Sequence, residues 1–269
     1  HGPQDTLVPW VQEATNHWAH LLHATGGNLK PAKCYWYLLQ YRFVRGIASL
    51  ASKAQLSHHF LTIPQPDGSQ VSIDLKDPTE ASNVLGVLVS PTGDGEPMLQ
   101  HMLSKGYKWS NRVLKSRLLP NDAWFSFKTQ AIMSVKYGLI PLMASRASIE
   151  SKLSRWYYHC LPALGVNCSI GHEWRTLPFE FQGLGLPNLT LEKLSDSLHL
   201  LQHHWSHNTT LGQALHLSFE LVQVETGLYG NFLLRDYSTF ECLASHTWFK
   251  QIWELSSHYQ VQVHLSEGI

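Results

Sequence analysis

A turn segment at residues 91–95, Pro-Thr-Gly-Asp-Gly, divides the sequence into two parts with different hydrophobic patterns. Before it, short β-favouring runs alternate with turns rich in glycine and proline. After it, apolar residues recur every three to four positions over long segments, which is the periodicity of helices. We therefore expect an α+β fold, with a small partial β-sheet and a helix at its N-terminal end, followed by a mostly α-helical region. Three segments are expected, at residues 1–94, 95–180 and 181–269.

The first part contains one predicted helix and several predicted strands. Residues 8–23 have helical spacing and end at Thr25-Gly26-Gly27, a typical C-cap. Residues 34–43 are aromatic and continuous, which favours one buried strand. A hairpin is expected at 60–74 around Pro66-Asp67-Gly68, and a further strand at 83–94.

In the second part, helical spacing dominates. Helices are expected at residues 96–116, 121–137, 148–161, 190–205, 211–226 and 239–256, and a last strand at 259–265.

The bulk charge excludes little, because Lys plus Arg and Asp plus Glu each number 20. Only local clusters can therefore indicate a nucleic-acid partner. The four cysteines form no C-x-x-C pair, which fits free thiols in a reducing compartment. We expect an intracellular location, nuclear or cytoplasmic. No apolar run reaches the roughly 18 residues of a membrane span, so no membrane partner is expected.

One predicted helix carries a row of cations. Lys105, Lys108, Arg112 and Lys115 are spaced 3, 4 and 3 residues apart, with Trp109 beside them and no acid between Lys105 and Arg117. At about 100° per residue they cover only about 80° of a helix surface. Such a row favours contact with nucleic-acid phosphates, although a solvated helix face has the same pattern.

Motifs for catalysis are absent from the sequence. No two acidic residues are adjacent, so the clustered carboxylates of a two-metal centre are not visible. The P-loop, the dinucleotide-binding motif and the nucleophile elbow are also missing. His199, His203 and His207 share one helical face, which leaves a zinc site as a weak alternative to a polar surface. We therefore assign no metal ligand.

Two stretches nevertheless carry a resemblance. "WAHLLHATGGNLKPAKCYWYL", followed by "LGVLVSPTGD", resembles the end of the palm in reverse transcriptases of eukaryotic, non-LTR-like retrotransposons. In these enzymes a helix, a glycine turn of the type G-x-x-L-x-x-x-K, a strand and a later Leu-Gly strand follow the catalytic aspartates. The matching positions are Gly26, Gly27, Leu29, Lys33, Cys34, Leu85, Gly86 and Val87.

Two downstream segments are also similar to this family. Residues 177–189 resemble its P-x-x-x-G-G-L-G-L-P segment, with Gln182 in place of the first glycine of the pair, and residues 248–255 resemble its C-terminal flank. The resemblance therefore spans most of the chain, and identifies residues 1–94 with the palm end, 95–180 with a thumb-like region and 181–269 with the flank.

The resemblance implies roles for single residues. Lys33 would lie near the phosphates of the incoming nucleotide, as an electrostatic stabiliser or general acid. Leu85 and Gly86 would lie on the strand that grips the primer end, and the cations and Trp109 on a helix along the template–primer. A palm also requires the strands at 34–43 and 84–89 to be neighbours in one sheet.

The implied partners are an RNA or DNA template–primer and the upstream part of the same polyprotein. Mg²⁺ belongs to the full-length enzyme, and no cofactor is expected on this chain alone, because the metal-binding aspartates should precede residue 1. The first residue, His1, suggests a processed product or fragment. The alternative is a non-enzymatic helical protein-interaction module or a domesticated retroelement remnant, which zero net charge and ten tryptophans favour.

Overall fold

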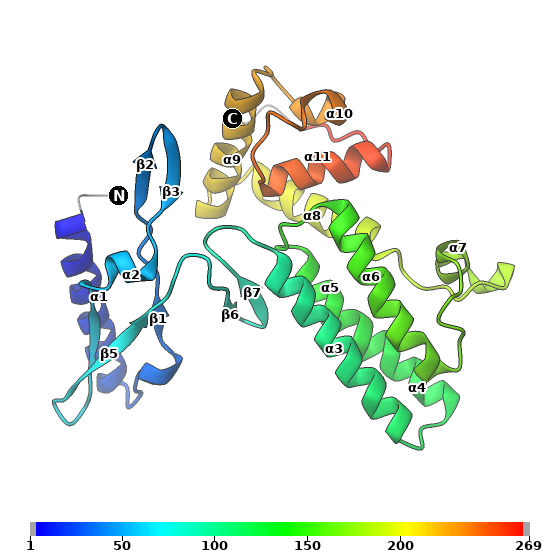
Figure 1. Cartoon of the computed structure of the whole chain (residues 1–269), viewed down its shortest axis with the longest axis horizontal. Helices are drawn as coiled ribbons and strands as arrows, with labels where there is room; N and C mark the ends of the chain where they lie inside the picture. Colours follow the sequence, from blue (N-terminus) through cyan, green and yellow to red (C-terminus); the bar gives the residue numbers. More distant parts are fainter. Residues whose placement is uncertain (1–3, 266–269) are drawn as a thin grey trace. The chain divides into compact units, whose positions relative to one another are not determined.

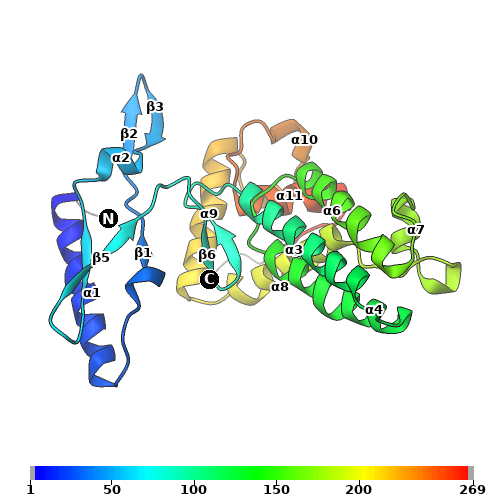
Figure 2. The same ribbon diagram turned by 60° about the horizontal axis from the view of Figure 1, so that its bottom comes forward.

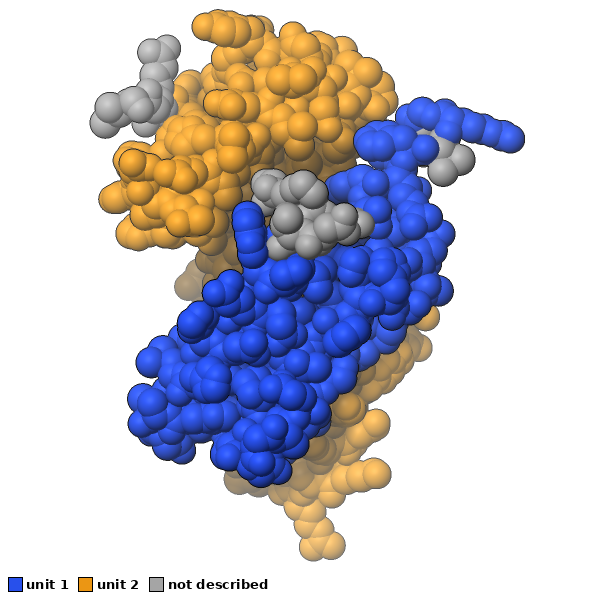
Figure 3. Space-filling model, turned by 90° about the vertical axis from the view of Figure 1, so that its left-hand side faces the viewer, with its two compact units in different colours: residues 1–82, 90–92 blue, residues 83–89, 93–269 orange. Residues whose placement is uncertain are grey.

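The computed structural model describes residues 4–265, and these residues form two compact units (Figure 3). Unit 1 comprises residues 1–82 and 90–92, and unit 2 comprises residues 83–89 and 93–269. Each unit is described by itself below.

Unit 1 consists of one long helix and short strands. Its elements are α1 (Gln4–Ala24), η1 (Pro31–Lys33), β1 (Tyr35–Trp36), β2 (Tyr41–Val44), β3 (Ile47–Leu50), α2 (Lys53–Leu56), β4 (Leu61–Pro64) and β5 (Gln70–Leu75). The Gln12 side chain fastens α1 to β4, because its amide donates to Thr62 O and accepts from Thr62 N, both at 2.8 Å. Apolar residues of this helix and sheet form a small core that includes Ala19, Leu61 and Ile63.

The sheet of unit 1 has the strand order β1-β5-β4. β4 and β5 are antiparallel, with Leu61 opposite Ile73, and this confirms the hairpin expected at residues 60–74. β1 runs parallel to β5, with Trp36 opposite Leu75.

The single buried strand expected at residues 34–43 is wrong. The segment divides into β1 and β2, and β2 pairs only with β3 in a separate hairpin whose Tyr41 and Phe43 are exposed. Arg45 and Gly46 at its turn have φ angles of 53° and 79°. Positive φ at both central positions gives a tight turn that twists with its strands, so residues 41–50 pair locally.

The same kind of turn overturns the expected pairing of residues 34–43 with residues 84–89. Leu85 and Gly86 have φ angles of 51° and 88° and join β6 (Ser82–Val84) to β7 (Val87–Val89) in a two-stranded hairpin. The expected strand at 83–94 is therefore a hairpin. Its strands pair with each other, and β1 pairs with β5.

After the β6–β7 hairpin, unit 2 is built of helices (Figure 1). They are α3 (Glu96–Lys115), α4 (Pro120–Ser126), η2 (Phe127–Ile132), α5 (Met133–Leu139), α6 (Arg146–Cys160), η3 (Leu161–Leu164), α7 (His172–Thr176), η4 (Phe179–Phe181), α8 (Leu189–Trp205), α9 (Thr210–Thr226), η5 (Phe232–Leu234), α10 (Tyr237–Phe240) and α11 (Trp248–His258). The structure is therefore α+β, rich in helix, with sheets of two or three strands.

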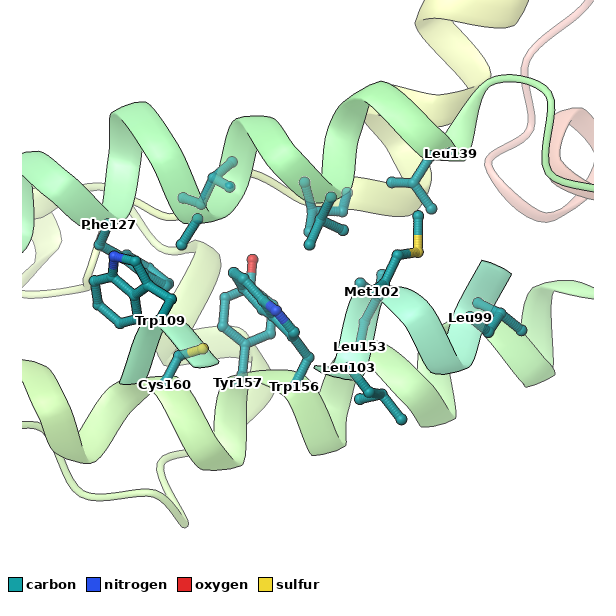
Figure 4. Packing of buried hydrophobic residues seen from close by; sticks show 14 of the residues in the cluster. Leu99, Met102, Leu103, Trp109, Phe127, Leu139, Leu153, Trp156, Tyr157 and Cys160 are labelled. Carbon is teal, nitrogen blue, oxygen red and sulfur yellow. The ribbon is translucent and has the colours of Figure 1, made fainter. Parts of the chain in front are cut away.

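Two hydrophobic clusters stabilise unit 2. The first lies between α3, α6 and the continuous path from α4 to α5 (Figure 1), and α3 and α6 also lie side by side in Figure 2. At its centre, the rings of Trp109, Phe127, Trp156 and Tyr157 point toward one another (Figure 4). The second joins α8, α9 and α11 through aromatic residues that include Phe219, Phe232, Phe249 and Trp253.

A buried lysine closes the C-terminal end of α5. Lys193, of which 2% is exposed, donates from Nζ to Leu139 O at 2.6 Å and to Leu142 O at 2.8 Å. Burial lowers the pKa of Lys193 to about 8. The ammonium thereby donates to carbonyl groups at and just after the helix end, of which Leu139 O also accepts from Leu142 N at 3.2 Å.

Most of the helices expected from the sequence are present, but two helices and the last strand differ from the expectation. Residues 121–137 form one continuous path, but its middle is the π-helix η2. The helix expected at 239–256 begins only at Trp248, because Thr247 caps it by accepting from Lys250 N, whereas Asp236 caps the separate α10. The described residues of the expected last strand, 259–265, pair with no strand.

All four cysteines are free thiols. None of the helices in the described part of the chain has the length and apolar character that crossing a membrane requires.

Candidate nucleic-acid interface

Helix α3 carries the cation row and is fixed firmly on its opposite face. Pro97 in the first turn suits a helix start, and Asp94 Oδ1 accepts from Glu96 N at 2.9 Å. Glu96 also accepts from Lys152 Nζ of α6 at 2.5 Å, and this bond lowers the pKa of the Glu96 carboxyl. The buried residues of α3 include Met98, Leu99, Met102, Leu103, Trp109 and Val113.

Close packing against α6 depends on Gly106. A Cβ atom at Gly106 would clash with the ring of Trp156, so only glycine lets these two helices approach at this point. The core thus determines which face of α3 is turned to solvent.

The cation row occupies that solvent face, as the sequence predicts. Lys108, Arg112 and Lys115 are exposed, and Lys105 is partly exposed. Within the described residues none of the four forms an ion pair or a side-chain hydrogen bond. Their charges are therefore available to an external anion.

Three of these cations line an open groove of about 560 Å³ in unit 2. Lys105, Lys108 and Arg112 form one wall, whereas the other comes from α4, η2 and α5. That second wall presents small polar side chains four residues apart: Asp122, Ser126, Gln130 and Ser134. A wall of cations facing hydroxyl and amide groups suits phosphate and sugar oxygens, which accept hydrogen bonds.

His101, on the same helix, lies close enough to the cation row for its charges to affect the imidazole. The pKa of His101 is lowered, first by burial and then by the charges of Lys105 and Lys108. The opposite wall carries one carboxylate, that of Asp122.

Trp109 is placed differently from the expectation. It borders the groove, but only 8% of it is exposed, and its ring packs on Phe127 at a centroid distance of 5.1 Å. Its indole Nε1 donates to Ser126 Oγ at 3.0 Å, which links α3 to the polar wall. Trp109 therefore shapes the groove, and its covered ring leaves only a small edge for the contact with nucleic acid that the sequence predicts.

Leu85 and Gly86 lie in the turn of the β6–β7 hairpin, so their predicted place on a strand is wrong. Leu85 is 87% exposed, and Gly86 N donates to Asn83 Oδ1 at 2.8 Å, which fixes the turn. An exposed apolar tip on a fixed turn remains accessible to a ligand.

Lys33 ends the short helix η1 in unit 1, directly before β1. Its side chain is exposed and forms no ion pair or hydrogen bond with a described residue. Lys33 and the cation row belong to different units, and each is available to solvent within its own unit.

The polar wall of the groove escaped the sequence analysis. Its signal was present as polar residues at 122, 126, 130 and 134, but such spacing is common on solvated helices.

No group of three or more His, Cys, Asp or Glu side chains that could hold a metal ion occurs among residues 4–265.

Comparison of the chain with protein-family models, with curated proteins and with solved structures finds no match.

Proposed function

We propose that unit 2 binds the sugar–phosphate backbone of a nucleic acid in the groove of α3, as the thumb-like part of a retrotransposon-type reverse transcriptase. The observation that carries the proposal is the row of four unpaired cations on α3, three of which line one wall of an open groove. Cations along a backbone release condensed counterions, which favours binding without sequence preference.

The wider assignment rests on the resemblance and on fewer structural observations. The sheet contact between residues 34–43 and 84–89, which a palm requires, does not occur among the described residues, so the strand pairing counts against the palm assignment. What supports the reverse-transcriptase proposal is the exposed Lys33 before a strand, the exposed turn at Leu85, and the basic helix that follows.

In this proposal the chain acts with an upstream part of the same polyprotein, in the nucleus or cytoplasm. That part would supply the aspartates that hold Mg²⁺, and this chain would supply contacts to an RNA or DNA template–primer. The chain alone is then expected to bind nucleic acid and not to polymerise nucleotides.

The test is binding of a labelled RNA–DNA primer–template over a salt series. Replacing Lys105, Lys108, Arg112 and Lys115 together by Gln should reduce the slope of log affinity against log salt by about 3–4. The control replaces Arg155 and Arg235, exposed arginines outside the groove, by Gln and should change the slope by less than about 1. An unchanged slope in the fourfold variant, or no binding by the folded wild type at low salt, would refute the proposal.

A second function is favoured by one apolar surface. Leu217, Leu221 and Val224 lie on one face of α9 and are all exposed. This face suits a protein-interaction module. If the fourfold variant retained full nucleic-acid binding, a Val224→Glu variant that lost a protein partner would favour this function.

A further inference from the structure

A second concave site of unit 2 lies apart from the groove of α3. It is a pocket of about 390 Å³ whose floor is one face of α6, formed by Arg146, Glu150, Leu153, Ser154 and Tyr157. Its remaining wall consists of His172, Arg175, Thr176, Pro187, Asn188, Leu189, Thr190, His258 and Tyr259. None of these residues lines the groove of α3.

Arg175 is the unusual member of this wall. It is only 8% exposed, yet no carboxylate lies within ion-pair distance of it among the described residues. Its Nε donates to Ile170 O at 3.0 Å, and its guanidinium carbon lies 5.5 Å from the centre of the Tyr157 ring. Its two terminal nitrogens have no hydrogen bond to a described residue.

A guanidinium carries a permanent positive charge. The two terminal nitrogens are not among the buried polar atoms that lack a partner, so they reach the open space of the pocket, where an acceptor from outside the chain can bind them. The nearby Tyr157 ring and the bond to Ile170 restrict the positions that the guanidinium can adopt. Such a preorganised fork matches the two oxygens of a carboxylate or a phosphate.

The other charged groups of the pocket leave this cation uncompensated. Arg146 donates to Glu150 at 2.7 Å, so these two charges neutralise each other. Burial raises the pKa of Tyr157, so its phenol stays neutral and adds no negative charge. Asn188, Thr190 and Tyr259 bond to one another, with Thr190 Oγ1 donating to Asn188 Oδ1 at 2.7 Å.

We propose that this pocket binds a small organic oxyanion, with Arg175 clamping its carboxylate or phosphate group. The apolar and aromatic side chains of Leu153, Tyr157, Leu189 and Tyr259 would accommodate an uncharged body next to that group. This site is separate from the proposed nucleic-acid function and does not depend on it.

The test uses titration calorimetry on the whole chain with phenyl phosphate, benzoate and inorganic phosphate as probes. Saturable binding of one phenyl phosphate or benzoate per chain is expected, and comparison of the two distinguishes phosphate from carboxylate recognition. Arg175→Met should weaken this binding about tenfold or more, since hydrogen bonds to charged groups are strong. Arg155→Met removes the same charge from the exposed side of α6 and should bind like the wild type.

A second variant covers the case in which Arg175→Met fails to fold. Ser154 is exposed at the pocket, so Ser154→Phe should fill the pocket while Arg175 itself is retained, and should weaken binding by a similar factor. The proposal is overturned if the folded wild type binds none of the probes at millimolar concentration, or if either folded variant binds as tightly as the wild type.

Discussion

The indole Nε1 of Trp109 donates a hydrogen bond to Ser126 Oγ at 3.0 Å, and so joins the helix of the cation row to the opposite wall of its groove. The ring of Trp109 is part of the first hydrophobic cluster of unit 2. The groove is thus supported by the core. We expect its cations to affect nucleic-acid binding and its buried tryptophan to affect the stability of the fold.

Trp109→Phe tests this separation. We expect a loss of about 1–2 kcal/mol in the free energy of unfolding, because a hydrogen bond and part of a buried ring are removed. Affinity for the primer–template should change less than about twofold, because the ring is covered. Urea unfolding and the binding titration measure the two effects, with Arg112→Gln as the variant of opposite behaviour. A large loss of affinity with unchanged stability would mean that Trp109 contacts nucleic acid directly.

Leu85→Ala tests the exposed tip of the β6–β7 hairpin. Because Leu85 is 87% exposed, the free energy of unfolding should change by less than about 0.5 kcal/mol. Any weaker binding of the primer–template would then report a lost contact. Asn83→Ala is the comparison, because it removes the acceptor of the Gly86 N–H and should loosen the turn itself. Equal binding by Leu85→Ala and the wild type would exclude the tip from the interface.

Lys33→Ala tests the role that the resemblance implies for the lysine before β1. The experiment requires the chain joined to an upstream segment that contains the catalytic aspartates. Nucleotide incorporation should slow about 100-fold if the cation stabilises charge in the transition state. Lys30→Ala removes an exposed cation three residues away and should retain nearly full activity. Similar rates for both variants would leave Lys33 as a surface residue.

Lys193 predicts an unusual dependence of stability on pH. Its pKa falls from 10.5 to about 8 on folding, so between these values the unfolded chain binds more protons than the folded chain. The contribution of Lys193 to stability therefore rises as the pH rises through this window, by up to about 3 kcal/mol, and is constant below it.

The measurement is urea unfolding from pH 8 to 10.5, comparing the wild type with Lys193→Met. The comparison is needed because burial raises the pKa of the Cys160 thiol to about 12, which makes stability fall with pH in both proteins. The difference between the two proteins should grow in favour of the wild type as the pH rises. A constant difference would show that the carbonyl groups around Nζ hold the ammonium charged throughout.

Gly106→Ala should lower the free energy of unfolding by about 1–3 kcal/mol, because the added methyl group overlaps the ring of Trp156. At an ordinary helical position the same substitution stabilises a protein, so the sign of the change is decisive. Urea unfolding at equal protein concentration gives this sign. An increase in stability would mean that α3 and α6 pack less closely here.

Helix positions could be predicted from the sequence because the apolar residues of a long amphipathic segment recur with the period of a helix. The cation row is the best example, since its 80° arc requires only helical geometry, and α3 supplies it with its buried face opposite. The β structure was less readable. At Arg45-Gly46 and Leu85-Gly86 a non-glycine residue adopts positive φ, and neither dipeptide is a strong turn signal.

The sites were only partly readable, for a different reason. Charge and spacing placed Lys105, Lys108, Arg112 and Lys115 in solvent, but burial of Trp109 depends on Phe127, which comes from another helix. The unpaired Arg175 could not be found at all, because the lack of a carboxylate neighbour is a property of the packed chain.

The contact between Gly106 and Trp156 couples the residue types that are possible at two positions 50 residues apart in the sequence. A chain related to this one that carries a side chain at position 106 has no room for an indole at position 156, and a smaller residue there would restore the fit. The two positions should therefore change together during divergence, and glycine at the first should accompany a large ring at the second.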